Sequence, residues 1–165
     1  MNPLEPPDSH HLRAAIGWIE LGNGLEATDE LEQITVALRS HPDVLEVRWR
    51  IGAQAKQWER CIELATALTQ ITPEQSLGWI YLANSLYWAG RTPEARDTLL
   101  GVRERFPDEP GLPYNLACYE CQLGNLAKAI NWLDIAFGLG NGKRLRRAAL
   151  EDEDLQPLWK HLGKV

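Results

Sequence analysis

Residues 81–100 read YLANSLYWAGRTPEARDTLL, and residues 115–133 read NLACYECQLGNLAKAINWL. A shift of 34 positions aligns the small and apolar residues of the two strings: Ala83 with Ala117, Gly90 with Gly124, Ala95 with Ala129 and Leu99 with Leu133. From Ala95 and Ala129 onward, small and apolar residues recur at i, i+4 and i+7, as Ala95-Leu99-Val102 and Ala129-Leu133-Ala136, so in each unit they form one face of a second helix. The chain is therefore predicted to contain a helical repeat of 34 residues.

The same register continues toward the N-terminus with more divergence. Shifting back by 34 places Ala95 over Cys61 and Pro107 over Pro73, and Gly22 lies two steps before Gly90. Lys56 stands where a glycine is expected. The glycines are expected to end the first helix of each hairpin, because glycine accepts the left-handed backbone conformation there.

This reading predicts an all-α chain, because no segment alternates strongly enough to indicate a strand. Thr92 and Asn125 are predicted to cap second helices of hairpins with their side chains. The helices are expected near residues 8–21, 25–40, 43–55, 57–71, 75–89, 93–105, 111–123 and 126–138.

Composition limits the possible functions. The chain has 165 residues with a net charge of -6 and a pI near 5.2, which argues against a general nucleic-acid binder. No apolar run approaches the ~20 residues that span a bilayer, and the first residues do not resemble a signal peptide. Three cysteines are too few for a disulfide framework and fit a reducing compartment. A soluble cytoplasmic protein without membrane contact is expected.

The order Trp79, Leu82, Ala83, Gly90, Ala95, Leu99 and Pro107 is similar to the tetratricopeptide repeat, a helix–turn–helix unit. The match extends over roughly residues 10–140. Leu86 and Leu99 depart from the aromatic residues usual in this family, and Pro113 replaces the tryptophan in the last unit. The resemblance implies a right-handed superhelical stack of antiparallel helix hairpins, a solenoid.

The resemblance also implies how the chain is organised. Residues 1–7 are expected to form an extended arm, and residues 8–140 about four hairpins, of which 76–107 and 110–141 are well formed. Residues 143–165 resemble the closing element that follows the last repeat in many bacterial tetratricopeptide proteins. Such an element covers the apolar face that the last hairpin would otherwise expose.

First helices of such hairpins line a concave groove that usually binds peptides, so the resemblance implies a protein-interaction module or adaptor. The partner would be a protein or peptide. The implied groove residues are Arg50, Gln54, Ile80, Asn84, Tyr87, Trp88, Tyr114, Asn115, Cys118, Cys121 and Gln122. Asn84 and Asn115 match the two asparagines of a family carboxylate clamp, but Ile80 replaces its lysine.

Two alternatives remain beside this reading. The chain could self-associate into a homo-oligomer through exposed tryptophans such as Trp18 and Trp132. It could also be an enzyme or a metal protein, which the residues disfavour. Cys118-x2-Cys121 is only half of a zinc motif, and no nucleophile, base and orienting group can be named together. No catalytic residue, metal site or cofactor is therefore predicted.

Charged residues near the C-terminus are also read as non-catalytic. The basic run Lys143-Arg144-Leu145-Arg146-Arg147 precedes the acidic run at residues 151–154. The basic run is either a solvated face or a site for an anionic partner. The acidic run is expected to be solvated and either ends the same helix or begins the next one.

Overall fold

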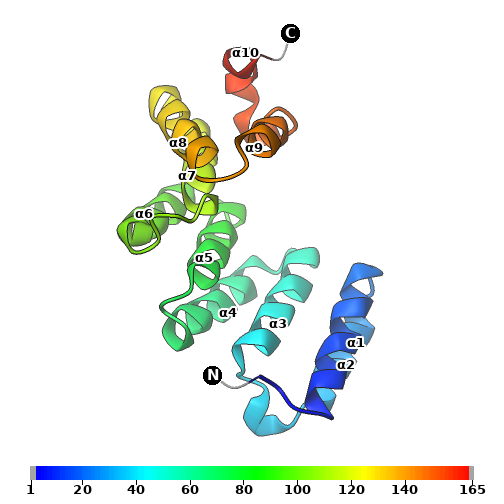
Figure 1. Ribbon diagram of the computed structural model, residues 1–165. Coiled ribbons are helices and arrows are strands. Elements are labelled where there is room, and N and C mark those ends of the chain that lie inside the picture. Colours follow the sequence, from blue (N-terminus) through cyan, green and yellow to red (C-terminus); the bar gives the residue numbers. More distant parts are fainter. Residues whose placement is uncertain (1–2, 164–165) are drawn as a thin grey trace. The chain divides into compact units, whose positions relative to one another are not determined.

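The computed structural model describes residues 3–163, which form ten α-helices and three short 3-10 helices without any strand (Figure 1). This confirms the all-α fold predicted from the repeat. The chain divides into two compact units, residues 1–81 and residues 82–165. The boundary lies inside the helix α5 (Ser76–Trp88).

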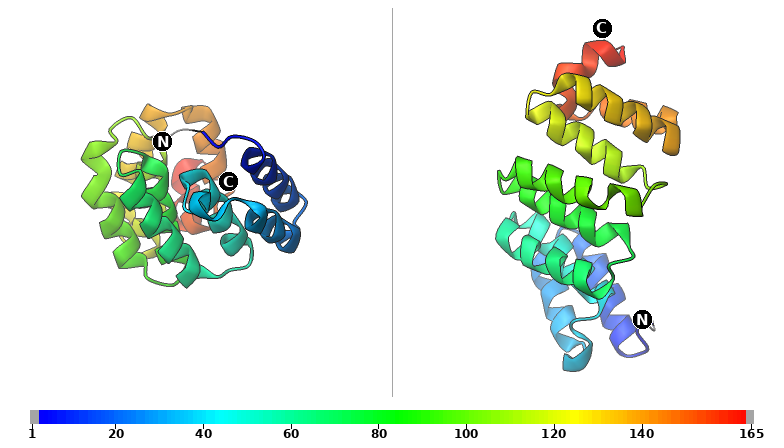
Figure 2. Two further views of the ribbon diagram at one scale, coloured as in Figure 1. Left: turned by 90° about the horizontal axis from the view of Figure 1, so that it is seen from below. Right: turned by 90° about the vertical axis from the view of Figure 1, so that its left-hand side faces the viewer.

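Unit 1 consists of two helix hairpins followed by the first part of α5. Its elements are α1 (Asp8–Glu20), α2 (Gly24–Gln33), the 3-10 helix η1 (Val36–Leu38), α3 (Pro42–Gln54) and α4 (Trp58–Ile71). The helices α1 and α2 lie side by side in Figures 1 and 2. Apolar side chains of α1, α2 and α3 form one core, against which Leu4 of the N-terminal arm also packs.

Unit 2 begins with the end of α5 and contains the remaining helices. They are α6 (Thr92–Val102), η2 (Arg103–Arg105), α7 (Gly111–Gln122), α8 (Leu126–Leu139), α9 (Gly142–Ala149), η3 (Glu153–Leu158) and α10 (Trp159–Leu162). The helices α7 and α8 pack as an antiparallel hairpin, and both α9 and η3 pack back onto this hairpin (Figure 2).

Four turns of one kind create the hairpins. Residues 22, 56, 90 and 124, each 34 apart, all have positive φ, between 54° and 80°. At each turn the next residue's N–H bonds the carbonyl five residues earlier, as in Asn23 N to Trp18 O at 2.8 Å and Arg91 N to Leu86 O at 2.9 Å. This is the Schellman pattern that ends a helix. Gly22, Gly90 and Gly124 stop the first helices as predicted, and Lys56 adopts the same conformation without being glycine.

Small residues allow the paired helices to approach closely. Ala83, Ala95, Ala117 and Ala129 are fully buried, as the repeat predicts. In unit 1 Cys61 takes this role opposite Gly52, where an added Cβ would lie 2.9 Å from the Cys61 sulfur. A larger side chain at these positions would overpack the crossing, at a cost of about 1–3 kcal/mol.

Three local predictions were wrong. The helix expected over 25–40 ends at Gln33, and Ile34 is extended and buried. The carboxylate of Asp8 accepts hydrogen bonds from the Thr35 amide at 2.6 Å and from the Thr35 hydroxyl at 3.2 Å, which hold the chain in that turn.

The two predicted caps also differ. Thr92 is the first residue of α6 rather than its cap. Asn125 occupies the cap position of α8, but its side chain donates instead to the buried carboxylate of Glu120 at 2.7 Å. A buried polar group without a hydrogen bond costs more than an unfilled helix cap, so Asn125 bonds Glu120 instead of capping α8.

Replacing Lys56 with glycine is expected to stabilise unit 1. A side chain in the left-handed region costs about 1–2 kcal/mol, which glycine avoids. Glycine also loses more conformational entropy on folding, which offsets part of this gain in stability. Urea denaturation of Lys56→Gly should show a gain of about 0.5–1 kcal/mol. Lys56→Ala, which removes the charge but keeps Cβ, should leave stability nearly unchanged. Equal effects in the two variants would contradict the explanation.

Candidate functional site

Of the predicted groove residues, five that lie on α5 and α7 of unit 2 are near the C-terminal segment or an aromatic cluster. On α7 the residues Tyr114, Cys118 and Gln122 recur every four positions and share one face. Near the end of α5, Tyr87 contacts Tyr119 at a ring distance of 5.1 Å and Trp88 edge-on at 5.2 Å. We call Tyr114, Cys118 and Gln122 of α7, together with Tyr87 of α5, the α7 wall.

The α7 wall holds the chain's own C-terminal segment. The Tyr87 hydroxyl donates to Asp154 Oδ1 at 2.5 Å, and the Tyr114 hydroxyl donates to Asp152 Oδ2 at 3.0 Å. The Cys118 thiol lies 3.7 Å from the same Asp152 oxygen. Gln122 Nε2 donates to the backbone carbonyl of Asp154 at 2.8 Å. Residues on helix faces thus bind both side chains and backbone of another segment.

The acidic run at 151–154 is therefore only half solvated, contrary to the prediction. Glu151 and Glu153 are exposed, whereas Asp152 and Asp154 are half-buried against the α7 wall. Asp152 begins η3 by accepting a hydrogen bond from the Asp154 amide at 3.0 Å. The run thus starts a new element after α9, one of the two alternatives left open.

Apolar burial anchors this segment in addition to its hydrogen bonds. Leu155 and Leu158 of η3 are almost completely buried, and so is Ala149 at the end of α9. Full burial of a leucine contributes roughly 1.5–3 kcal/mol. The segment is consequently a stable part of unit 2.

Burial and nearby charges keep the tyrosine hydroxyls and the Cys118 thiol of this site protonated. Burial, and then the hydrogen bond to Asp154, raises the pKa of Tyr87. Burial, and then the charge of Asp152, raises the pKa of Tyr114 and of Cys118 well above their usual values. Burial also raises the pKa of Asp154, although the Tyr87 hydrogen bond opposes this. Cys118 is a thiol here, without the thiolate character that a nucleophile needs.

One group of potential metal ligands lies in the same place. A ligand atom each of Cys118, Asp152 and Asp154 lies within 4.8 Å of the others. Zinc binds cysteine as thiolate, and the raised pKa of Cys118 opposes that form. Hydrogen bonds from Tyr87 and Tyr114 already satisfy the two carboxylates. We therefore interpret the group as a hydrogen-bonded anchor for η3.

The other predicted residues of unit 2 lie nearby in different environments. The Tyr119 hydroxyl donates to Asn84 Oδ1 at 2.7 Å, so that this amide oxygen already accepts a hydrogen bond within the fold. Asn115 is half-buried and Cys121 is buried. Trp88 is 57% exposed and is the most accessible aromatic of the set.

Unit 1 holds the remaining predicted residues on a second surface, the α3 face. Arg50 and Ile80 are half-buried there, and Gln54 is exposed, donating to the Ile19 carbonyl at 3.1 Å. Sequence reasoning missed a stacked pair beside them. The rings of Trp49 and Tyr81 are 3.8 Å apart and nearly parallel. Trp49 and Tyr81 lie on the first helices of adjacent hairpins, α3 and α5. The repeat register already placed both residues on first helices, so this pairing could have been considered from the sequence.

The Tyr81 hydroxyl belongs to the same surface. It donates to Glu46 Oε1 at 3.3 Å. Burial, and then the charge of Glu46, raises the pKa of Tyr81 to about 12. The α3 face therefore presents an aromatic stack in which the hydroxyl of Tyr81 is oriented by its hydrogen bond to Glu46.

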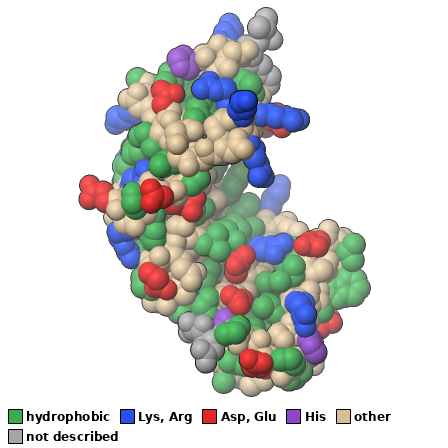
Figure 3. Space-filling view, in the orientation of Figure 1, with side chains coloured by type: hydrophobic (Ala, Val, Ile, Leu, Met, Phe, Trp, Pro, Cys, Tyr) green, Lys and Arg blue, Asp and Glu red, His purple; other side chains and the backbone are tan. Residues whose placement is uncertain are grey.

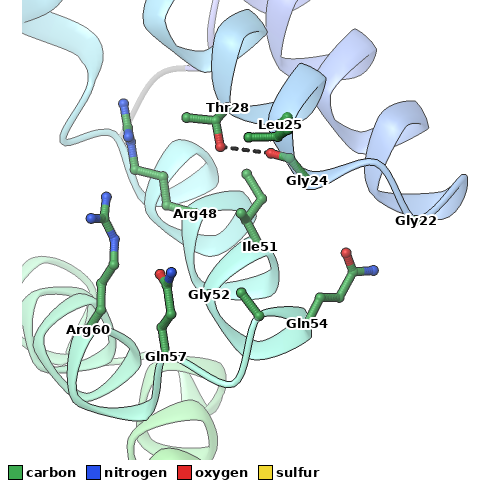
Figure 4. Close-up of a pocket in the computed structure, with 11 residues that line it drawn as sticks. Gly22, Gly24, Leu25, Thr28, Arg48, Ile51, Gly52, Gln54, Gln57 and Arg60 are labelled. Atoms are coloured by element: carbon green, nitrogen blue, oxygen red, sulfur yellow. Dashed lines mark hydrogen bonds between the residues drawn. The ribbon is translucent and has the colours of Figure 1, made fainter.

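An open pocket of about 480 Å³ lies near one end of this face (Figure 4). It is lined by residues of α2, α3 and α4 and of the turns that precede α2 and α4, among them Leu25, Arg48, Ile51, Gln54, Gln57 and Arg60. The Thr28 hydroxyl donates to the Gly24 carbonyl at 2.8 Å at its rim. Gln54 thus connects the predicted groove residues with a cavity that the sequence did not reveal.

The basic run forms α9, whose charged side chains are exposed. Figure 3 shows basic side chains gathered at this edge of unit 2. The Arg146 guanidinium lies 4.7 Å from the centre of the Phe137 ring, and Arg147 pairs with Glu151 at 3.4 Å. Arg146 and Arg147 lie in the last turn, where cations favour the helix dipole.

Within residues 3–163, no helix combines the length and the apolarity that crossing a membrane requires.

The hydrogen bond between Tyr87 and Asp154 is expected to couple α5 to η3. A double-mutant cycle of Tyr87→Phe and Asp154→Ala should give a coupling free energy of about 1–2 kcal/mol, because the bond reaches a carboxylate. Urea denaturation of the four proteins at neutral pH measures it. Additive effects of the two substitutions would show that the contact does not anchor η3.

Unit 2 is also expected to lose stability in alkali. Tyr87, Tyr114 and Tyr119 have folded pKa values raised above the usual 10.0, so their contribution is complete below that pH. It is lost as the pH rises through the folded pKa, because the unfolded chain releases the protons first. Denaturation across this range should show a falling free energy of unfolding, with a shallower fall in Tyr114→Phe. Tyrosinate absorbance of the folded protein appearing near the ordinary pKa would contradict this.

No protein-family model matches the sequence, and no curated protein matches it. Solved structures match its fold. TTC0263, a thermophilic TPR protein of Thermus thermophilus, has a TM-score of 0.73 at 19% identity, covering 95% of this chain and 84% of its own. A MamA RS-1 double mutant has a TM-score of 0.69 at 11% identity, covering 85% and 79%. MamA MSR-1 has a TM-score of 0.65 at 20% identity, covering 80% and 76%. The chain therefore has the fold of a tetratricopeptide-repeat protein, as its repeat predicted.

Proposed function

We propose that this chain is a protein-interaction module that binds a segment of a partner protein on the first helices of its hairpins. The observation that carries the proposal is the α7 wall, which holds residues 152–154 by hydrogen bonds to side-chain carboxylates and to a backbone carbonyl. Helix faces of this fold can therefore bind a peptide segment, here one from the same chain. Extended concave surfaces are what such repeats use for binding.

The same contacts indicate where a partner would bind. In unit 2 the α7 wall is occupied by a segment anchored through Leu155 and Leu158. Displacing this segment would expose both leucines to water, which costs roughly 1.5–3 kcal/mol for each. The α3 face of unit 1, with Arg50, Gln54 and Ile80, carries no such segment among the residues described. We therefore place the partner on the α3 face, with exposed Trp88 of unit 2 as a separate candidate anchor.

Binding is favoured over catalysis on chemical grounds. The raised pKa values of Cys118 and Cys121 keep both thiols protonated, and the nearby tyrosines are protonated too. Such groups donate hydrogen bonds but supply neither a nucleophile nor a general base at neutral pH.

Self-association is the second candidate function. Trp18 packs against the unit 1 core and Trp132 is half-buried, so neither offers the open face that the sequence suggested. Leu21, Leu25 and Val36 are instead more than 70% exposed and favour a contact with another protein surface. Sedimentation at increasing concentration tests this candidate directly. A mass that stays monomeric would remove it.

A quantitative pull-down followed by mass spectrometry tests the interaction proposal with two variants, Arg50→Glu and Trp88→Ser. A partner retained by the wild type should be reduced at least about tenfold by one of them, because hot-spot residues, which are enriched in tryptophan and arginine, cost about 2 kcal/mol or more when removed. The controls are Leu100→Ser and Lys128→Glu, matched changes on the second helices α6 and α8. Circular dichroism must show equal helicity in all five proteins.

If both groove variants retain the same proteins as the wild type, or if nothing is retained by any protein, the proposal fails.

A further inference from the structure

The pocket of unit 1 has an apolar floor and a polar, cationic side (Figure 4). Leu25 and Ile51 supply the aliphatic surface, and Gln54 and Gln57 supply amides at the rim. The side chains of Arg48 and Arg60 extend along the same side of the cavity. None of the described residues that line it is acidic, although acidic residues outnumber basic ones in the chain, 23 to 17.

The arginines at and beside this pocket outnumber the carboxylates that neutralise them. Glu32 is the acid that faces the cations, pairing with Arg48 at 2.8 Å and with Arg39 at 2.7 Å. Its pKa is lowered chiefly by the hydrogen bond from Arg48, and the charges of Arg39 and Arg60 act in the same direction. Two guanidinium groups thus share one carboxylate, and Arg60 adds a third positive charge without an ion pair of its own to Glu32. Arg60 is exposed at the pocket and is available to a further anion.

Aliphatic surface at the same place is unusually open. Leu25, at the pocket, is 79% exposed, and Leu21 in the preceding turn is 76% exposed. A single exposed leucine has no significance by itself. Two of them beside a cavity floored by Ile51 and edged by cations form an amphipathic surface. Covering this apolar area with a partner side chain would favour binding.

We propose that this pocket docks a protein segment in which an aliphatic side chain is flanked by carboxylates, the aliphatic group on Leu25 and Ile51 and a carboxylate on Arg60. The inference deepens the proposed function and rests on it, because it names the chemistry of the partner segment. Charge complementarity and the apolar floor select this occupant. A nucleic acid would need base-stacking surfaces, and the described residues of the pocket lining include no aromatic side chain.

The position of Arg60 makes a clean variant possible. It is the third residue of α4 (Trp58–Ile71), where an acidic side chain favours the helix dipole, so Arg60→Glu should fold normally. Lys128→Glu changes the net charge equally on α8 of unit 2 and serves as the matched control.

The test is a titration of isotope-labelled full-length protein with a synthetic peptide, followed by amide NMR spectra. The peptide contains one leucine flanked by glutamates and is blocked at both ends, so that only side chains carry charge. Amide signals of Gly22, Gly24 and Gln57 should shift saturably. The affinity should fall at least about tenfold in Arg60→Glu, in high salt, and for peptides with serine for leucine or lysine for glutamate. Lys128→Glu should bind as the wild type does.

Absent shifts, shifts confined to other residues, or equal affinity in the wild type and Arg60→Glu would overturn the inference. Its failure is distinguishable from failure of the proposed function. A partner lost from Arg50→Glu or Trp88→Ser in the pull-down, with no peptide binding at Gly22 and Gly24, would leave the interaction module intact and remove the pocket. Peptide binding that depends on Arg60, with no effect of Arg50→Glu and Trp88→Ser, would support the pocket and remove the α3 face.

Discussion

The left-handed turn that recurs every 34 residues is the constraint on which the rest of this structure depends. At each turn the amide after the turn residue bonds a carbonyl five residues back, which satisfies the end of the first helix and reverses the chain. The second helix must then return along the first. Without this reversal the buried alanines would have no partner helix to pack against.

Close packing inside the hairpins uses one side of each first helix and leaves the opposite side to contact other segments. On α7 this side holds the acidic turn of η3 through the Tyr114 hydroxyl and the Gln122 amide, and Tyr87 of α5 adds a second hydroxyl. On α3 it presents the stacked Trp49 and Tyr81 rings and Arg50. One geometry thus yields two surfaces of different use, because among residues 3–163 a segment of the chain itself covers the first surface and not the second.

Local electrostatics separate these surfaces further. Near η3, burial and then the carboxylates of Asp152 and Asp154 raise the pKa values of Tyr87, Tyr114 and Cys118, which keeps these groups protonated. Near Glu32, Arg39 and Arg48 share one carboxylate, and Arg60 leaves positive charge beside an apolar pocket. An acidic chain therefore carries a cationic site that its net charge conceals.

The sequence by itself determined the helices, the hairpin turns at Gly22, Gly90 and Gly124, and the buried alanines, because these depend on spacing along the chain and on backbone preference. It also placed the candidate residues on first helices, since that follows from the same register. Only the tertiary structure decided that Asp152 and Asp154 bind Tyr114 and Tyr87, that Asn125 serves Glu120 and that Arg60 borders a pocket. These contacts join residues distant in the sequence or depend on how side chains share partners, and neither leaves a periodic signal.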